Sequence, residues 1–205
     1  DGVFKTKLNA QICLAYAYGD GKVISCENAI NAVSELFHGV PINSYFSFEI
    51  DSMPVLTDAI GGVDLTALET IGNFTEGEQV HLNSSNVESY LRSRRFDIID
   101  ASSLRQKRQM QFIQEYIKLA VDKTKSDITT PLNIYNTMKD YMVTNIGANK
   151  VTFLAGTYLT SGVDTAGITT LQGQTKMGET YVEFYPDEAA KLDLFIKTYY
   201  TKVTE

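Results

Sequence analysis

Residues 90–109 read Tyr-Leu-Arg-Ser-Arg-Arg-Phe-Asp-Ile-Ile-Asp-Ala-Ser-Ser-Leu-Arg-Gln-Lys-Arg-Gln. Six of the chain's 18 Lys and Arg residues lie between Arg92 and Arg108, and only Asp97 and Asp100 oppose them, so this segment is +4 (6 − 2) in a chain of net charge −7. Five of the six are Arg, whose planar guanidinium matches phosphate oxygens and keeps its charge. The composition of the segment favours an anion-binding site.

The surrounding pattern places the basic residues on two consecutive helices. Ser85 and Glu88 form a capping-box pattern, which predicts a helix over residues 86–92. A second helix is predicted to open at residues 102–103 and to run to about Lys123. Its predicted apolar stripe consists of Met110, Ile113, Ile117 and Ala120.

The spacing on the second helix brings three polar side chains together. Arg105 and Gln109 are four residues apart and share one face, and Arg108 lies beside them. The first turns of this helix would add free N–H groups and a positive dipole end, so both clusters can converge on one anion. The alternative is a solvated charged face, on which Arg92 only complements the C-terminal end of a helix.

The overall charge argues against nucleic-acid binding. A net charge of −7 and a pI near 4.9 give no basic field, whereas phosphate contacts supply most of the affinity of a DNA-binding protein. The chain has no apolar run of the ~20 residues that span a bilayer, and no signal segment. Because Asp1 is not an initiator residue, we expect the chain to be a processed or truncated piece.

The remaining pattern interleaves helices with strands, which implies a layered α/β or α+β domain of residues 1–205. A loop is predicted over residues 72–83. Strands are predicted over residues 44–50, 63–65, 151–154 and 181–185. Further helices are predicted over residues 8–18, from Ser25 to His38, from Ser52 to Gly61, over residues 132–143, and from Asp187 onward.

The cysteines and histidines give no metal motif. Cys13 and Cys26 are either two small buried apolar residues or one disulfide. His38 and His81 lie far apart in sequence without other ligands at metal-binding spacing, so no metal site is predicted within the chain.

Several motifs, in order along the chain, resemble those of the LytR-CpsA-Psr family. The basic segment resembles the family's tyrosine–x–arginine–x–arginine and arginine–x–x–arginine–glutamine signature. The others are Lys7-Leu8-Asn9-Ala10, Ala15-Tyr16-Ala17-Tyr18-Gly19, Asp58-Ala59-Ile60-Gly61-Gly62-Val63-Asp64, Thr144-Asn145-Ile146 and Tyr185-Pro186-Asp187-Glu188.

The resemblance implies a fold and an activity. The fold is α/β, a three-layer α/β/α sandwich with a mixed central sheet and an apolar lipid-binding pocket. The activity is a phosphotransferase-type ligation, in which a cell-wall glycopolymer (teichoic acid or capsular polysaccharide) passes from a polyprenyl-pyrophosphate carrier to peptidoglycan. Family members are extracytoplasmic, membrane-anchored proteins of mainly Gram-positive bacteria, so we expect a missing anchor and missing N-terminal strands here.

The resemblance also implies site residues. Arg92, Arg94, Arg105, Arg108 and Gln109 would bind the pyrophosphate, with Arg105 and Arg108 in catalytic roles. The family's Mg²⁺ ligands would lie upstream of residue 1. Candidates to line the lipid pocket are Phe46, Phe48, Leu56, Ile113 and Ile117. An extracytoplasmic domain also makes a Cys13–Cys26 disulfide more plausible.

Three alternatives remain open from the sequence. The chain could be a non-catalytic module that binds the lipid carrier or the envelope. It could be a transcriptional attenuator, as an older label of the family states. Within the basic segment, Asp97 and Asp100 would pair with the arginines, or Asp100 would take part in metal binding or proton removal.

Overall fold

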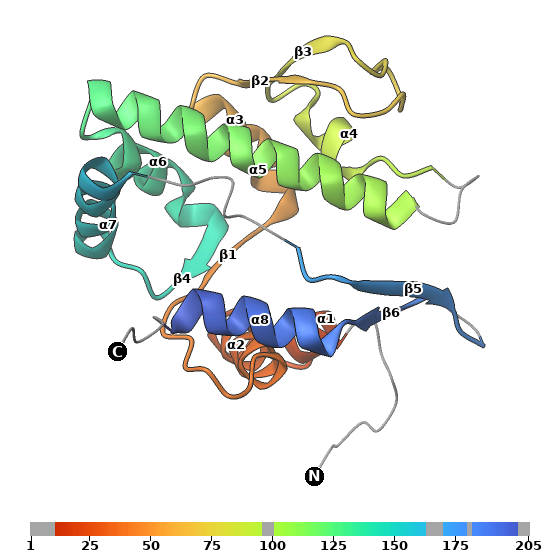
Figure 1. The fold of residues 1–205 in the computed structure, drawn as a ribbon. Coiled ribbons are helices and arrows are strands. Elements are labelled where there is room, and N and C mark those ends of the chain that lie inside the picture. The colour runs from red at the N-terminus through yellow and green to blue at the C-terminus, as the bar shows by residue number, and fades with distance from the viewer. Residues whose placement is uncertain (1–10, 96–100, 163–169, 180–181, 201–205) are drawn as a thin grey trace, which may run out of the picture. The chain divides into compact units, whose positions relative to one another are not determined.

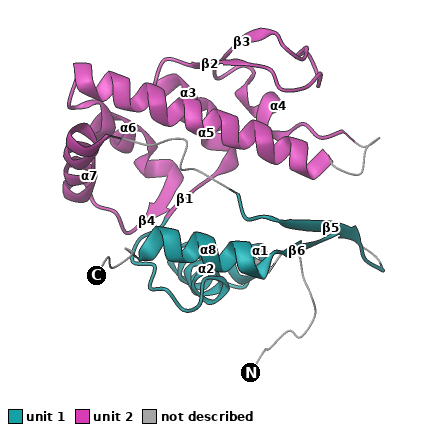
Figure 2. Cartoon of the chain, viewed as in Figure 1, with its two compact units in different colours: residues 1–45, 169–205 teal, residues 46–168 magenta. Residues whose placement is uncertain are grey.

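The computed structural model describes residues 11–95, 101–162, 170–179 and 182–200. Two compact units can be separated, one of residues 1–45 and 169–205 and the other of residues 46–168, and each is described by itself (Figure 2). The predicted mixed α/β class is confirmed. Within the described residues the strands form three two-stranded antiparallel sheets, in place of the single mixed central sheet expected. The expectation of one domain stays a prediction.

The first unit combines three helices with a β-hairpin. It contains α1 (Gln11–Ala17), α2 (Val23–Leu36), β5 (Gly173–Met177), β6 (Val182–Pro186) and α8 (Glu188–Tyr199). The predicted start of α8 is confirmed, because the Asp187 carboxylate accepts hydrogen bonds from the N–H groups of Ala189 and Ala190. Such a cap satisfies two of the donors that every helix leaves open at its N-terminus.

The start of α2 differs from the prediction. Ser25 does not cap this helix but lies buried inside its first turn. The N-cap residue is Lys22, and Oδ1 of Asp20 accepts from the N–H groups of Lys22 (2.7 Å) and Ser25 (3.3 Å). Cys26 is buried in α2 and Cys13 is exposed on α1, and both are thiols, so the disulfide is not formed.

The second unit carries the basic segment (Figure 1). Its elements are β1 (Phe46–Phe48), the 3-10 turn η1 (Ile50–Ser52), α3 (Met53–Ala59), β2 (Val63–Thr66), β3 (Gln79–Leu82), α4 (Val87–Arg92), α5 (Ala101–Ser126), α6 (Thr130–Met138), the 3-10 turn η2 (Lys139–Tyr141), β4 (Met142–Thr144) and α7 (Ala148–Ser161).

A hydrophobic core lies where α3, the β2–β3 hairpin, α4 and α5 meet. The strand pattern of β2 explains one side, because Val63 and Leu65 are buried while Asp64 and Thr66 are exposed. Among the other buried members are Ile60, Phe74, Leu82, Val87, Tyr90, Leu91 and Phe112. This core fixes α4 against α5 and so positions the basic segment.

The turn between α3 and β2 depends on two glycines. Gly61 and Gly62 have φ angles of +81° and +87°, a region that favours glycine. A Cβ on Gly62 would lie 2.3 Å from atoms of the His81 ring. The predicted end of this helix at the glycine pair is therefore confirmed.

Three predicted elements differ in the structure. Part of the predicted loop over residues 72–83 is strand β3, which pairs with β2 from Val63 opposite Leu82 to Thr66 opposite Gln79. The helix predicted to Val143 ends at Met138, and strand β4 follows after η2. Residues 151–154, predicted as a strand, lie inside α7.

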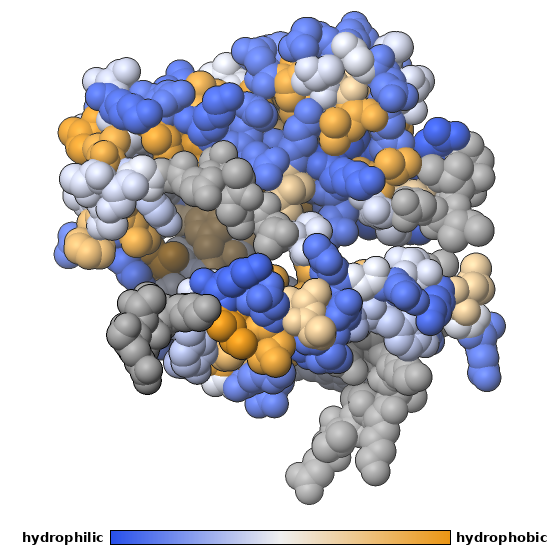
Figure 3. All heavy atoms as spheres, viewed as in Figure 1, coloured by the Kyte–Doolittle hydropathy of each residue, from blue (hydrophilic) through white to orange (hydrophobic). Residues whose placement is uncertain are grey.

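The buried face of α5 agrees only in part with the predicted stripe. Arg108 and Phe112 are buried, and Tyr116 and Ala120 pack against the core. Of the predicted stripe, Ala120 contacts the core and Met110 and Ile117 are half-buried, whereas Ile113 is 45% exposed. Both hydrophilic and hydrophobic residues appear on the viewed face of the unit around α5 (Figure 3). The helix is apolar on more than one side, which is why periodicity alone did not identify Arg108 and Phe112 as its buried residues.

Candidate functional site

The site begins at the C-terminal end of α4. A helix leaves its last four carbonyl groups without partners inside the helix. Here side chains of α5 supply some of the missing donors. Nε of Arg108 donates to the Tyr90 carbonyl (2.8 Å), and Nε2 of Gln109 donates to the Leu91 carbonyl (3.2 Å). The two helices of the basic segment are thereby joined by direct hydrogen bonds.

Arg108 is the centre of this junction and is only 1% exposed. Besides Tyr90, its guanidinium donates to the carbonyl of Ser93 and forms an ion pair with the buried carboxylate of Glu69. The guanidinium carbon also lies 5.7 Å from the centre of the Tyr90 ring. A buried charge is tolerated only when it is paired and hydrogen-bonded, and these contacts meet that requirement.

Glu69 completes the buried pair from the segment after β2. Its Oε1 faces Arg108, whereas Oε2 is buried without a hydrogen-bond partner among the described residues. Arg108 is therefore the group that compensates for the burial of this carboxylate. Removing the arginine would leave a negative charge buried and unpaired, which is costly.

Tyr90 stabilises the junction between α4 and α5 through its hydroxyl and its ring. Its hydroxyl donates to Oε1 of Gln111 (3.0 Å), and its ring contacts the Phe74 ring at 5.0 Å between centres. Burial raises the pKa of the Tyr90 hydroxyl above its ordinary value. The tyrosine is thus a neutral structural member of the core.

The other arginines are accessible. Arg92, whose side chain is 50% exposed, pairs with Asp51 (3.1 Å) and with Glu88 (2.5 Å). Arg94 is exposed and Arg105 half-buried. Within the described parts of the chain, neither Arg94 nor Arg105 has a hydrogen bond or ion pair. Their guanidinium donors are available to a ligand.

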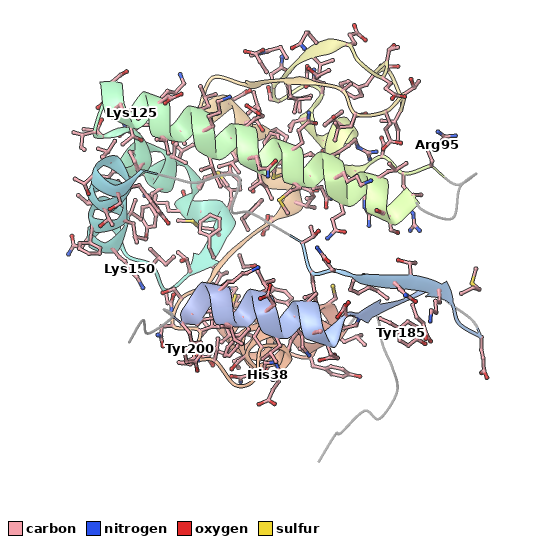
Figure 4. The ribbon with its side chains drawn as sticks, viewed as in Figure 1. His38, Arg95, Lys125, Lys150, Tyr185 and Tyr200 are labelled. Atoms are coloured by element: carbon pink, nitrogen blue, oxygen red, sulfur yellow. The ribbon has the colours of Figure 1, made fainter. Side chains whose placement is uncertain are left out.

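The predicted site residues lie on two segments that are joined by hydrogen bonds, the end of α4 and the first half of α5. Arg92 and Arg94 flank Ser93, whose carbonyl accepts from Arg108, and Arg105 precedes Gln109 by one turn of α5. Arg95 lies beyond the end of α4 with its side chain directed outward (Figure 4). Asp97 and Asp100 lie outside the described residues.

Arg108 has a structural role that the sequence did not predict, and its predicted role at the pyrophosphate stays a prediction. Each of its three guanidinium nitrogens donates to a protein oxygen, so the residue holds α4 against α5. Sequence reasoning could not find Glu69, because it lies 39 positions from Arg108. The assignment of the remaining four residues to the pyrophosphate stays a prediction.

No metal site is visible in the described part of the chain. The residues there contain no group of three or more His, Cys, Asp or Glu side chains that could hold a metal ion. The expectation that the Mg²⁺ ligands lie upstream of residue 1 stays a prediction. None of the described helices combines the length and apolar character needed to cross a membrane.

The five residues predicted to line a lipid pocket differ in how deeply they are buried. Phe46 is 47% exposed, Phe48 is 36% exposed and Ile113 is 45% exposed, whereas Leu56 and Ile117 are half-buried. An apolar side chain that remains this exposed contributes little to the core. The lipid pocket stays a prediction.

A model of the LytR_cpsA_psr family matches residues 2–197. The chain belongs to this family. The family resemblance noted in the sequence is thus confirmed, since the match covers nearly the whole chain. Among curated proteins no match was found.

Solved structures of similar proteins support the fold of this LytR_cpsA_psr chain. TagV from Bacillus subtilis is 19% identical with a TM-score of 0.70, over 98% of this chain and 79% of that one. A transcriptional regulator from Enterococcus faecalis is 19% identical with a TM-score of 0.70, over 91% and 67%. TagT bound to LI-WTA is 16% identical with a TM-score of 0.64, over 91% and 68%.

Proposed function

We propose that this chain transfers a cell-wall glycopolymer from a polyprenyl-pyrophosphate carrier to peptidoglycan at the extracytoplasmic face of the cell membrane. Membership of the LytR_cpsA_psr family supports the class of activity, and a structure of the similar protein TagT was determined bound to LI-WTA. One observation carries the assignment of the site. Arg94 and Arg105 present guanidinium groups without protein partners in the described chain, next to a junction fixed by buried Arg108.

The proposed chemistry is a phosphoryl transfer. A hydroxyl oxygen of the acceptor glycan attacks the phosphorus that carries the glycopolymer. The bond from that phosphorus to the bridging oxygen breaks, a phosphodiester forms, and polyprenyl phosphate leaves while the hydroxyl proton is lost. Negative charge grows on the leaving phosphate, and positioned arginines stabilise that charge more in the transition state than in the ground state.

The residues have distinct proposed roles. Arg94 and Arg105 bind the pyrophosphate oxygens with Arg92, which would exchange its contacts to Asp51 and Glu88 for the ligand. Those two ion pairs are exposed and therefore contribute little that must be given up. Gln109 donates one amide N–H to the Leu91 carbonyl and would offer the other to the ligand, and Arg108 keeps the two helices at a fixed spacing.

Substitution of Arg105 tests this proposal, with Lys107 as the control. Both residues lie on α5 and carry one positive charge, but Lys107 is exposed and off the proposed site. We expect Arg105→Ala to weaken binding of a polyprenyl pyrophosphate roughly 10- to 100-fold, since a hydrogen bond to a charged group contributes about 1.5–3 kcal/mol. Lys107→Ala should bind like the unmodified protein in calorimetric titrations, and mass spectrometry should find polyprenyl phosphate retained with it.

Two results would count against the proposal. If Arg105→Ala retains the lipid fully, the site is assigned wrongly. If both variants lose affinity equally, general charge and not the site explains binding. A protein that binds the carrier but transfers nothing to peptidoglycan would be the non-catalytic module.

A further inference from the structure

A concave region lies in the same unit, on the side of α4 that faces the β2–β3 hairpin. It has a volume of about 440 Å³ and is lined by the turn after β2, by β3 and by the start of α4. This volume is in the range of small-molecule sites, roughly 300–1,000 Å³. The lining residues used below are Asn73, Phe74, Glu78, His81, Asn86 and Ser89.

Two of these polar residues are already held in place. Nδ1 of His81 lies 2.7 Å from Oδ1 of Asp64. Asn86 accepts from the N–H of Asn83 (2.9 Å) and donates to the His81 carbonyl (3.0 Å). Side chains whose rotamers are already fixed by hydrogen bonds lose little conformational entropy when a ligand binds.

Three other polar groups are open to a ligand. The Asn73 amide, the Glu78 carboxylate and the Ser89 hydroxyl line the hollow, and none has a side-chain hydrogen bond to the parts of the chain that the structure describes. They come from the turn, the residue before β3 and α4, so they approach the hollow from different elements. Together they offer an amide, a carboxylate and a hydroxyl.

The apolar floor connects the hollow with the arginine site. The Phe74 ring, 7% exposed, contacts the Tyr90 ring, which lies under the Arg108 guanidinium. On α4 the Ser89 carbonyl accepts from the N–H of Ser93, whose own carbonyl accepts from Arg108. The hollow therefore lies at the start of α4, and the arginine site lies at the end of the same short helix.

We infer that this hollow binds a neutral saccharide, namely sugar residues of the acceptor glycan; the identity of the glycan rests on the proposed function. Hydroxyl and acetamido groups of a sugar match the amide, hydroxyl and carboxylate groups, and the apolar face of the ring matches Phe74. A phosphate-bearing polymer is disfavoured, because no Lys or Arg is among the described residues that line the hollow and Glu78 would repel it.

The probe for this site is the N-acetylglucosamine tetramer, titrated into the whole chain and followed by calorimetry or by NMR. We expect Asn73→Ala combined with Ser89→Ala to weaken binding roughly tenfold, because two hydrogen bonds are lost. Glu78→Gln should weaken it too, whereas Glu76→Gln, on the same turn but outside the hollow, should not. All variants should bind polyprenyl pyrophosphate as the unmodified protein does.

Absence of saccharide binding at millimolar concentrations would overturn the inference, as would binding that the Asn73, Ser89 and Glu78 variants leave unchanged. Equal weakening by Glu76→Gln would also overturn it. Because pyrophosphate binding is measured separately, loss of the saccharide with retention of the lipid contradicts only this inference. Retention of the saccharide without any lipid binding supports the saccharide site and contradicts the proposed function.

Discussion

The guanidinium of Arg108 is almost completely buried, while the side chain of Arg92 in the same basic segment is half exposed. Burial gives the ion pair of Arg108 with Glu69 a large structural consequence, because desolvated charges depend on their partner. The pairs of Arg92 with Asp51 and Glu88 are solvated and contribute little. Residue type alone does not distinguish the two roles.

Substitution of these two arginines should show the difference. We expect Arg108→Met to lower the free energy of unfolding by about 3–5 kcal/mol, since Glu69 is left buried and unpaired. Arg92→Met should lower it by less than about 1 kcal/mol. Urea denaturation measures both values. Adding Glu69→Gln to Arg108→Met should restore part of the loss, and equal effects of the two single variants would contradict this assignment.

For individual residues, the sequence predicted which side chains share a helix face but not the role of each side chain. The spacing of Arg105 and Gln109 was sufficient to place them on one face of α5. The burial of Arg108 depends on Glu69, Tyr90 and Ser93, which come from other segments, and no local pattern encodes that contact. A buried carboxylate far away in sequence is visible only once the chain is folded.

Among the elements, the link between α3 and β2 is sensitive to its glycines. Gly62→Ala should lower the melting temperature strongly, because the added Cβ would meet the His81 ring at 2.3 Å and the Leu82 carbonyl at 2.9 Å. Gly77 is the control: its φ is +80°, but a Cβ there meets nothing within 4 Å. Gly77→Ala should cost only the conformational strain, about 1–2 kcal/mol. Thermal melts by circular dichroism compare the two, and a smaller effect at Gly62 would refute the expectation.

The contact between α3 and the loop before α4 should depend on pH. Hydrogen bonds from the Ser84 hydroxyl and from the Ser84 N–H (2.9 Å) lower the pKa of Asp58 below its ordinary value. A lowered pKa means that the ionised group stabilises the fold fully above its unfolded-state pKa of about 3.9, and that this contribution is lost as the pH falls through the folded-state pKa.

Asp58→Ala should therefore be less stable than the unmodified protein at pH 7, and the difference should shrink as the pH is lowered below about 4. Urea midpoints measured from pH 7 to pH 2 follow this change. Ser84→Ala retains the backbone N–H donor and should show a smaller difference at pH 7. A difference that stays constant over this range would show that ionisation of Asp58 is not involved.

The elements that the sequence predicted correctly are those bounded by residues that start or end a helix. Pro54 and the Gly61–Gly62 pair bound α3, and Asp187 caps α8. The errors arose where short segments have no such signal. Val151 and Phe153 suggested a strand inside α7, while β3 depends on pairing with β2 and was taken for a loop. Strand identity is set by a partner strand, and propensity alone does not reveal it.

For the whole molecule, a net charge of −7 should prevent general DNA binding. A similar protein from Enterococcus faecalis is described as a transcriptional regulator, so DNA binding by this chain should be tested directly. We expect no shift of a 30-base-pair duplex at micromolar protein and physiological salt, because no basic field draws phosphate to the surface. An electrophoretic mobility assay tests this, with polyprenyl-pyrophosphate binding as proof of active protein. A salt-sensitive DNA complex would revive the attenuator hypothesis.

The way α4 ends has a consequence for how this protein can vary. Its last carbonyls are satisfied by Arg108 and Gln109 from α5, whereas Arg92 and Arg94 make no contact on which the core depends. Among the arginines, the residue that holds the fold and the residues proposed to bind the ligand can therefore be changed independently. The accessible arginines can be exchanged to suit another anion while the fold is preserved, but Arg108 and Glu69 can change only together.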